Sequence, residues 1–318
     1  MEALLEKLGR DRWLTTEEYA RLIRERPPRL GLLADRTRRR HRGPGVYLRG
    51  ILDVSSICQH DCPHCPQRCS ADPAIRCRLR PREILELCEE ALSLDIRSIV
   101  LRCGTDRFYS DEMLCGILEK LRRSCPELSV TLAMGERSRR SYERLYNAGA
   151  EGYLLLEETV DRERYERIHG ETLSFDRRLH CLGQLPDVGF RTGCGFLTGL
   201  PGQTAEDLAR ELKFLEEFQP QAVELVPLTA QPELTDCLLS IIRLILPGAA
   251  VTAPGNSPRC IPAGADVVSV RLAGGGTHPL CGGNFAPAAG DIESLAALRR
   301  ELSEAGFEVA MEPPRWNG

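Results

Sequence analysis

Three cysteines stand at a spacing that suits a metal cluster. The segment Cys58-Gln-His-Asp-Cys62-Pro-His-Cys65 directly follows a largely apolar run over residues 46–54. Thiolates spaced four and three residues apart can bind three irons of a [4Fe–4S] cubane, which leaves the fourth iron without a protein ligand. Because a purely structural metal site is normally closed, an open position indicates chemistry.

Two other interpretations of these cysteines stay open. A zinc site could combine them with His60 or His64, although zinc motifs usually come as two paired ligand sets. The three thiols could also be inert core residues, since free cysteine packs like a small apolar side chain. Cys69 lies four residues beyond Cys65, and as a fourth ligand it would close the open position. We favour the cluster, with Cys69 outside it.

The chain around the cysteines alternates between strand-like and helix-like segments. Eight apolar runs predict strands near residues 46–54, 97–102, 128–133, 151–156, 190–197, 221–227, 249–252 and 266–271. Amphipathic segments lie between them. One begins at Pro81, another is capped by Thr204, and the last covers 291–305 with Asp291 as its cap.

This alternation predicts a parallel sheet, because parallel strands need crossover connections. Eight repeats favour an α/β fold of the closed (β/α)8 TIM type, which removes sheet edges, over an open doubly wound sheet. In such a barrel the loop after the first strand lies at the carboxyl-terminal face, where active sites are built.

Residues 1–44 are expected to form an N-terminal helical extension. Thr15-Thr16-Glu17-Glu18 is a capping box ahead of apolar residues at helical spacing, and Gly43-Pro44-Gly45 then breaks the chain. No linker divides the remaining residues, so 45–318 are expected to form one barrel with a diverged carboxyl-terminal part. Glycines at 274–276 and 282–283 predict a loop there.

The composition argues against several functional classes. The 318 residues are 42% hydrophobic and 28% charged, as in folded proteins. A net charge of −4 gives no basic field for nucleic acid, and the basic run 36–42 is interpreted as a solvated face or a local anion contact. No apolar stretch reaches a membrane-spanning length and no signal peptide is recognisable, which predicts a cytoplasmic protein. Fourteen cysteines in that compartment indicate metal ligands and buried thiols rather than disulfides.

The pattern C-x3-C-x2-C after a first strand is the signature of radical S-adenosylmethionine (SAM) enzymes, which this chain resembles. Within that superfamily it resembles the biotin synthase-like group and, above all, the [FeFe]-hydrogenase maturases of the HydE family. The resemblance covers residues 1–250 in order. It is carried by segments 46–52, 99–106, 134–138, 153–159 and 193–204. The tail beyond 250 matches poorly.

The resemblance implies that Cys58, Cys62 and Cys65 hold a [4Fe–4S] cluster whose fourth iron binds SAM. In the superfamily, an electron from the cluster splits SAM into methionine and a 5′-deoxyadenosyl radical, which abstracts hydrogen from a substrate. The implied partners are a small-molecule substrate in the barrel cavity, an electron donor such as ferredoxin or flavodoxin, and other hydrogenase maturation factors. Neither nucleic acid nor a membrane is implied.

The resemblance also assigns contacts to SAM. Gly104 falls where the backbone meets the methionine amine, Glu158 where a carboxylate holds the ribose hydroxyls, and Arg178 where a guanidinium faces the SAM carboxylate. His64 replaces the aromatic residue that usually precedes the third cysteine, and it can still stack. Thr105 stands where the family has an acidic partner of the amine. By themselves, Glu158 and Arg178 would be interpreted as a surface ion pair.

Other departures from the family concern the cavity. The arginine that HydE directs into the cavity is Leu156 here, and the following histidine is Glu157. Losing a cation and gaining an anion predicts a cavity mouth that no longer prefers anionic ligands. Thr131 keeps a polar group that the family places there, whereas the family's threonine pair after the seventh strand is replaced by Ala253-Pro254.

The family's optional second cluster motif is absent from the carboxyl-terminal part. Cys260 and Cys281 are too dispersed to replace it. Cys103 and Cys194 are expected near the SAM pocket, either as buried filler or as ligands or reactive thiols. The glycines of 193–202 miss the dinucleotide fingerprint and are expected to let the backbone approach SAM.

Together these patterns predict a HydE-like radical SAM enzyme that acts in H-cluster maturation of [FeFe]-hydrogenase, or a paralogue with an altered substrate pocket. One alternative is another reaction of the biotin synthase group, such as a methylornithine synthase-like mutase or a sulfur-directed radical reaction. The other is a barrel that holds a metal without catalysis, which Thr105 favours.

Overall fold

A computed structural model describes residues 1–71, 76–272 and 292–310. Its eight main strands are parallel and neighbour one another in the order β7-β6-β5-β4-β3-β2-β1-β8. Their bounds are β1 Val46–Ser55, β2 Ser98–Cys103, β3 Ser129–Ala133, β4 Gly152–Leu154, β5 Arg191–Thr198, β6 Ala222–Pro227, β7 Ala250–Val251 and β8 Val267–Arg271. A short strand β9 (Val309–Ala310) pairs with the start of β1.

The two ends of this strand order meet. Thr252 forms a parallel bridge with Val267, and the N–H of Ala253 donates to the carbonyl of Val267 at 2.8 Å. The sheet therefore nearly closes on itself. The predicted (β/α)8 TIM-type barrel is confirmed, and the open doubly wound sheet is wrong.

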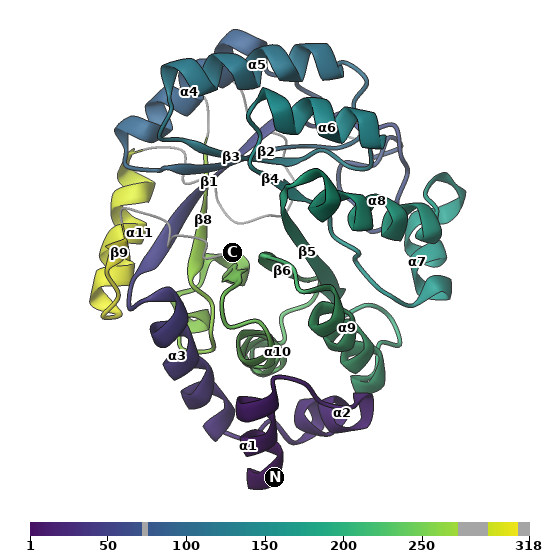
Figure 1. Cartoon of the computed structure of the whole chain (residues 1–318), viewed down its shortest axis with the longest axis vertical. Coiled ribbons are helices and arrows are strands. Elements are labelled where there is room, and N and C mark those ends of the chain that lie inside the picture. Colours follow the sequence, from purple (N-terminus) through teal and green to yellow (C-terminus); the bar gives the residue numbers. More distant parts are fainter. Residues whose placement is uncertain (72–75, 273–291, 311–318) are drawn as a thin grey trace.

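Helices connect the strands along the outside of the barrel (Figure 1). Their bounds are α4 Pro81–Ser93, α5 Asp111–Ser124, α6 Arg139–Ala148, α7 Arg162–His169, α8 Phe175–Val188, α9 Ala205–Phe218, α10 Pro232–Ile245 and α11 Ile292–Glu304, with 3₁₀ turns at Gly170–Thr172, Pro254–Asn256 and Pro258–Cys260. Pro81 opens α4, and the side chain of Thr204 caps α9, as predicted. The expected cap Asp291, Cys281 and the glycine-rich loop lie outside the described residues.

Three helices precede the barrel and lie together at one end of the molecule (Figure 1). They are α1 (Glu2–Asp11), α2 (Thr16–Glu25) and α3 (Arg29–Arg42), with α2 packed on α9 and α3 on α10. The predicted capping box is confirmed, since Thr15 accepts from the Glu18 N–H while Glu18 accepts from the Thr15 N–H. The domain boundary at 44/45 stays a prediction.

The basic run 36–42 ends α3, and its interpretation as a solvated face is wrong at two positions. Arg38 and Arg42 are buried. Arg38 pairs with Asp35, and Arg42 pairs with Asp266 at 2.6 Å. Arg42 therefore ties the helix to the barrel, whereas Arg38 pairs within the helix and donates to the carbonyls of residues 43–45 that follow it.

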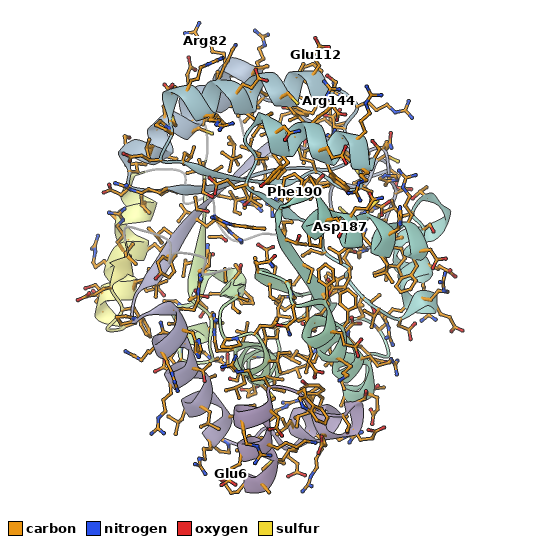
Figure 2. All side chains as sticks on the ribbon, in the orientation of Figure 1. Glu6, Arg82, Glu112, Arg144, Asp187 and Phe190 are labelled. Carbon is orange, nitrogen blue, oxygen red and sulfur yellow. The ribbon has the colours of Figure 1, made fainter. Side chains whose placement is uncertain are left out.

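Charged side chains project from the outer helices (Figure 2). Arg82, Glu112 and Arg144 are exposed on the outer helices. Phe190 is buried and makes edge contacts with the rings of Tyr142 and Tyr153. Within the described ranges, no helix is both long and apolar enough to cross a membrane.

Alternation along the strands decides what faces the interior of the barrel. On β1, Leu52 and Val54 belong to the main hydrophobic core, whereas Arg49 and Ile51 line cavities inside the barrel. Because successive side chains point to opposite faces, Asp53 shares the interior face with Arg49 and Ile51.

Candidate active site

The cysteine loop leaves β1 at the carboxyl-terminal end of the barrel, directly beside the end of β2. Ser55 is in register with Cys103. A Cβ added at Gly104 would lie 2.6 Å from the Cβ of Cys58 and 2.9 Å from its Sγ. Only a residue without a side chain therefore fits against this cysteine.

The base of the loop is braced by a buried carboxylate. Asp106 accepts from the Oγ of Ser55 at 2.6 Å. It also accepts from the Nε and Nη2 of Arg78 at 2.7 and 2.8 Å. Ser55 and Arg78 also form an antiparallel bridge across the base of the loop. These bonds hold the two ends of the loop together.

The three predicted cluster ligands share this loop. The N–H of Cys65 donates to the carbonyl of Cys62 at 2.9 Å, and the N–H of His60 donates to the Sγ of Cys58 at 3.4 Å. None of the cysteines in the described part of the chain forms a disulfide. Among the described residues, no three His, Cys, Asp or Glu side chains lie close enough together to hold a single metal ion.

The surroundings of the loop favour the neutral thiol of Cys62 and Cys65 over the thiolate unless a positive charge is bound there. Burial raises the pKa of Cys62 to about 12, with Glu158, Cys65 and Cys58 adding to the effect. Burial also raises the pKa of Cys65. Since iron binds the thiolate, the positive irons of a cluster would supply the charge compensation that these thiols lack. The donor set fits an iron–sulfur cluster.

Glu158 faces the cysteine loop from the end of β4. Its backbone lies at φ +64°, its N–H donates to the carbonyl of Gly195 at 3.0 Å, and its carbonyl accepts from the N–H of Leu197 at 2.9 Å. These bonds dock the residue on β5 and direct its carboxylate to the centre of the site.

Two imidazoles and a guanidinium surround that carboxylate. The Oε2 of Glu158 lies 3.0 Å from the Nε2 of His169 and 3.2 Å from the Nε2 of His64, and its Oε1 lies 3.7 Å from the Nη1 of Arg178. Burial alone would raise the pKa of Glu158, but His169, His64 and Arg178 together lower it well below its usual range. The carboxylate is therefore ionised and acts as an acceptor only.

His169 connects this carboxylate to the cysteine loop. Its Nδ1 lies 3.2 Å from the Sγ of Cys62, and the ring of Tyr165 covers it at 4.1 Å between centroids. The ring of His64 meets the ring of His169 edge-on, and the Nδ1 of His64 lies 3.1 Å from the carbonyl of Ile168. Burial alone would lower the pKa of His64, but Glu158 raises it above its usual value.

Arg178 extends from α8 and is held by protein groups. Its Nε donates to the Oε1 of Glu136 at 2.9 Å, and its Nη1 donates to the carbonyl of Leu156. Arg178 is buried, so it does not form the surface ion pair that the residue types alone would suggest. The guanidinium stands behind Glu158 and fixes its charge.

Two buried polar atoms beside the loop fit a bound polar cofactor. The Oε2 of Glu158 and the Nε2 of His169 are buried and lie 3.0 Å apart, but within the described ranges neither has a hydrogen bond of good geometry. Buried polar atoms normally have a partner, such as a ligand hydroxyl. Thr105 stands near this site, where its Oγ1 would lie 3.1 Å from a Cβ added at Gly135. Cys69 is exposed.

Glu157 does not lie at the cavity mouth. It is fully buried, its Oε2 accepts from the N–H of Gly195 at 2.7 Å, and it contacts the thiol of Cys194. Burial raises the pKa of Glu157 to about 7. Because Glu157 is fully buried against β5 and is bonded to its backbone, the prediction that it turns the cavity mouth against anions is wrong. The backbone turn at Glu158 directs Glu157 behind the strands.

Residues that the structure describes line two cavities inside the barrel. The lower one measures about 90 Å³ and includes the predicted polar residue Thr131 in its lining. The upper one measures about 310 Å³ and is lined by Arg102, Glu224 and Arg271, among others. Cys103 and Cys194 pack in the core, and burial raises the pKa of Cys103 to about 12.

Several residues of this region were not expected from the sequence. The local sequence around His169 does not distinguish it from an ordinary core histidine at the end of an amphipathic helix. Arg102, Glu224 and Arg271 did carry a signal, because each is a charged residue inside a strand whose neighbours are mostly apolar. In a barrel, such a residue has to face the interior or the helices.

Comparisons with known proteins agree with this geometry. The family model of the radical SAM superfamily matches residues 52–215. The [FeFe] hydrogenase maturase subunit HydE of Thermotoga maritima is 32% identical over 247 residues, which are 74% of this chain and 70% of that protein. A biotin synthase of Alkalilimnicola ehrlichii is 28% identical over 214 residues, or 63% of this chain and 61% of that protein.

The fold has a solved counterpart as well. A methylornithine synthase superposes with a TM-score of 0.81 over 96% of this chain and 97% of its own, at 21% identity, which supports the fold alone. The family match covers half of the chain, and the HydE subunit exceeds 30% identity. The predicted resemblance is thus confirmed, and the chain is an enzyme of the radical SAM superfamily, whose members use a [4Fe–4S] cluster and SAM.

Proposed function

We propose that Cys58, Cys62 and Cys65 bind the [4Fe–4S] cluster of this enzyme and that SAM binds to its fourth iron. The observation that carries the proposal is the fit of the loop: three thiols on one loop, two of them joined by a turn, with the backbone of Gly104 pressed against Cys58. When bound, the cluster supplies the electron that splits SAM into methionine and a 5′-deoxyadenosyl radical.

The protein's own residues would bind and orient SAM. The ionised carboxylate of Glu158 accepts from the two ribose hydroxyls, because one carboxylate can accept from both. His64 and His169 hold that carboxylate from one side and Arg178 from the other. The backbone of Gly104 approaches the methionine amine, and Thr105 offers a hydroxyl where a carboxylate is usual in the family. Arg178 is a positioning residue here, since its Nε donates to Glu136 and its Nη1 to the carbonyl of Leu156, which hold the guanidinium behind Glu158.

We further propose a HydE-like role in H-cluster maturation of an [FeFe]-hydrogenase, with a changed substrate pocket. The support is the 32% identity to a HydE subunit over 74% of the chain. A reductant of the ferredoxin or flavodoxin type would supply the electron. Hydrogen evolution after co-expression with the hydrogenase and the other maturation factors tests this role. A chain that replaces HydE supports it, and one that fails while still cleaving SAM favours another reaction of the biotin synthase group.

The cluster assignment is tested by reconstituting the full chain without oxygen. We expect about four irons per chain and 5′-deoxyadenosine released from SAM after reduction. Cys62→Ala should lose both, whereas Cys69→Ala should retain both. A protein that takes up zinc in place of iron, or a Cys62→Ala variant with the full iron content, would contradict the assignment.

A further inference from the structure

Arg76 connects the two ends of the cysteine loop, and the proposed SAM site does not use it. Its Nη1 donates to the carbonyl of Ser56 at 2.7 Å and to that of Gln67 at 2.9 Å. Its Nη2 donates to the carbonyl of Arg68 at 2.6 Å and to that of Cys69 at 3.4 Å. The first of these residues precedes the proposed cluster ligands, and the other three follow them. One guanidinium therefore holds the loop at both ends.

The backbone beside Arg76 is itself fixed to the end of β1. The N–H of Ser56 donates to the carbonyl of Cys77 at 3.1 Å, and the N–H of Cys77 donates to the Oγ of Ser56 at 2.9 Å. Next to this pair, Asp106 accepts from the Nε of Arg78 at 2.7 Å. Arg76 thus extends from a fixed base, so its guanidinium can hold the far end of the loop in place.

Two of these bonds reach peptide groups that position the cysteine-bearing part of the loop. The carbonyl of Gln67 accepts from Arg76, and the N–H of the same peptide group donates to the carbonyl of Cys65 at 3.2 Å. In the next peptide group the carbonyl also accepts from Arg76, and the N–H, which belongs to Cys69, donates to the carbonyl of His60 at 2.9 Å. Hydrogen bonds connected in this way polarise and strengthen one another.

The second of these chains of hydrogen bonds ends on a proposed cluster ligand. The N–H of His60 donates to the Sγ of Cys58 at 3.4 Å. Hydrogen bonds to the sulfurs help to set the reduction potential of an iron–sulfur cluster, because the N–H dipole stabilises the more negative, reduced state. Groups around the ligands also fix how the ligands are oriented. Arg76 therefore acts on Cys58 and Cys65 through the backbone.

Resting on the proposed function, we propose that Arg76 is a positioning residue that holds the cysteine loop and the N–H of His60 in place and thereby raises the reduction potential of the bound cluster. A guanidinium suits this role, because it is planar and presents five N–H donors in a fixed arrangement. The ammonium of lysine carries its donors on one nitrogen, so it keeps the charge but cannot hold both ends of the loop equally well.

A redox titration of the full chain, reconstituted without oxygen and followed by electron paramagnetic resonance, tests the proposal. Arg76→Gln should lower the midpoint potential of the cluster, because the N–H···S bond to Cys58 is no longer held in place. Arg76→Lys should recover only part of this shift. A midpoint that stays the same or rises in iron-loaded Arg76→Gln would overturn the proposal. Full recovery in Arg76→Lys would also overturn it, since charge alone would then account for the shift.

Arg68→Gln is the matched control. It removes the same charge from the same loop, where the side chain of Arg68 donates to the carbonyl of Cys65 at 3.3 Å, and it leaves the backbone carbonyl that Arg76 binds. Its midpoint should move less than that of Arg76→Gln. After exchange into D2O, electron–nuclear double resonance on the reduced cluster should show a weaker deuteron coupling in Arg76→Gln and an unchanged one in Arg68→Gln. Equal changes in the two variants would refute the positioning role.

Iron content is the readout if Arg76→Gln loads too little cluster for a titration. Arg76→Lys should then take up more iron than Arg76→Gln, and Arg68→Gln should take up as much as the unmodified chain. Equal iron loss in all three variants would overturn the proposal.

The two proposals fail in different readouts. An unmodified chain that holds no iron loses the proposed function, and this inference with it. An unmodified chain that loads iron and cleaves SAM, but whose midpoint and deuteron coupling are the same in Arg76→Gln, retains the proposed function and loses this inference alone.

Discussion

Glu158 combines an unusual backbone with an unusual charge environment. A non-glycine residue at φ +64° is uncommon, and such a conformation costs on the order of 1–3 kcal/mol unless its surroundings compensate. Here β5 holds the backbone by two hydrogen bonds, and His64, His169 and Arg178 surround the carboxylate. A carboxylate fixed in this way is already oriented for a ligand with hydroxyl groups.

Replacing Glu158 by Gln should weaken SAM binding. The amide has no negative charge and one acceptor oxygen, so we expect the dissociation constant to rise about tenfold or more. Equilibrium dialysis of SAM against reconstituted protein measures it. Glu163→Gln on the exposed side of α7 is the control. An unchanged affinity in Glu158→Gln, or an equal loss in the control, would contradict the proposed role.

Two other buried carboxyls give the fold a pH dependence. Burial raises the pKa of Glu211 from 4.5 to about 8, and that of Glu157 from 4.5 to about 7. The unfolded chain loses these protons near pH 4.5, whereas the folded chain keeps them to pH 7–8. The free energy of unfolding should therefore fall with rising pH across this window, by up to about 1.4 kcal/mol per pH unit for each group.

Glu211→Gln should remove one of these two contributions. Its amide oxygen can still accept from the N–H of Val160 and the hydroxyl of Thr159. Urea unfolding from pH 5 to pH 9 should give a shallower loss of stability for Glu211→Gln than for the unmodified chain. Glu217→Gln, on the exposed face of the same helix, should keep the full slope. Equal slopes in all three proteins would show that Glu211 is ionised in the folded state.

At the scale of elements, the site depends on how closely the end of β2 approaches the cysteine loop. The hydrogen bonds of Asp106 fix the base of the loop, and Gly104 leaves no space between β2 and Cys58. The position of the first cluster ligand is therefore set by strand packing and not by the loop alone.

Gly104→Ala should displace the loop and reduce iron incorporation severalfold. The added methyl would lie 2.6 Å from the Cβ of Cys58 and 3.2 Å from the carbonyl of Ile57. Iron analysis after anaerobic reconstitution measures the effect. Gly116→Ala in α5 is the control, because its methyl meets nothing within 4 Å. It should bind iron normally and be more stable by about 0.5–1 kcal/mol. Full iron content in Gly104→Ala would contradict this account of the loop.

The elements themselves were largely predictable from the sequence. Parallel strands buried on both faces appear as continuous apolar runs, and all eight runs became strands. The strand predicted at 151–156 ends at Leu154, because the turn at Glu158 takes the chain out of the ladder. That turn depends on bonds to Gly195 and Leu197, which lie far along the chain.

At the scale of the whole molecule, one buried network secures the seam of the barrel. The strand order ends at β7 and β8, where Thr252 and Val267 make a single bridge. Beside it, Asp266 accepts from Arg42 of α3 at 2.6 Å, from Arg243 of α10 at 2.7 Å and from the N–H of Val251 at 2.8 Å. The N-terminal helices thereby help to close the barrel.

Asp266→Asn should destabilise the fold strongly. Removing the charge leaves two buried arginines without this carboxylate, which costs about 3–5 kcal/mol in the free energy of unfolding. Urea unfolding at neutral pH measures it. Asp236→Asn removes an exposed partner of Arg259 and should cost less than about 1 kcal/mol. Similar losses in the two variants would contradict the role of Asp266 at the seam.

The composition of the site was only partly predictable, for a physical reason. The cysteine spacing is local and indicated cluster chemistry directly. His169 and the pair Arg102 and Arg271 come from separate elements, and their meeting depends on barrel closure. The position of Glu157 depends on the same turn that positions Glu158, so the sequence change at 157 indicated a cavity effect that the fold does not produce.

The most direct test of the account is electron–nuclear double resonance on the reduced, reconstituted chain with SAM labelled with 17O in its methionine carboxylate. We predict a hyperfine coupling between the label and the cluster, since SAM should bind the iron that Cys58, Cys62 and Cys65 leave open. A cluster without this coupling, or one whose fourth iron carries a protein side chain, would contradict the central claim.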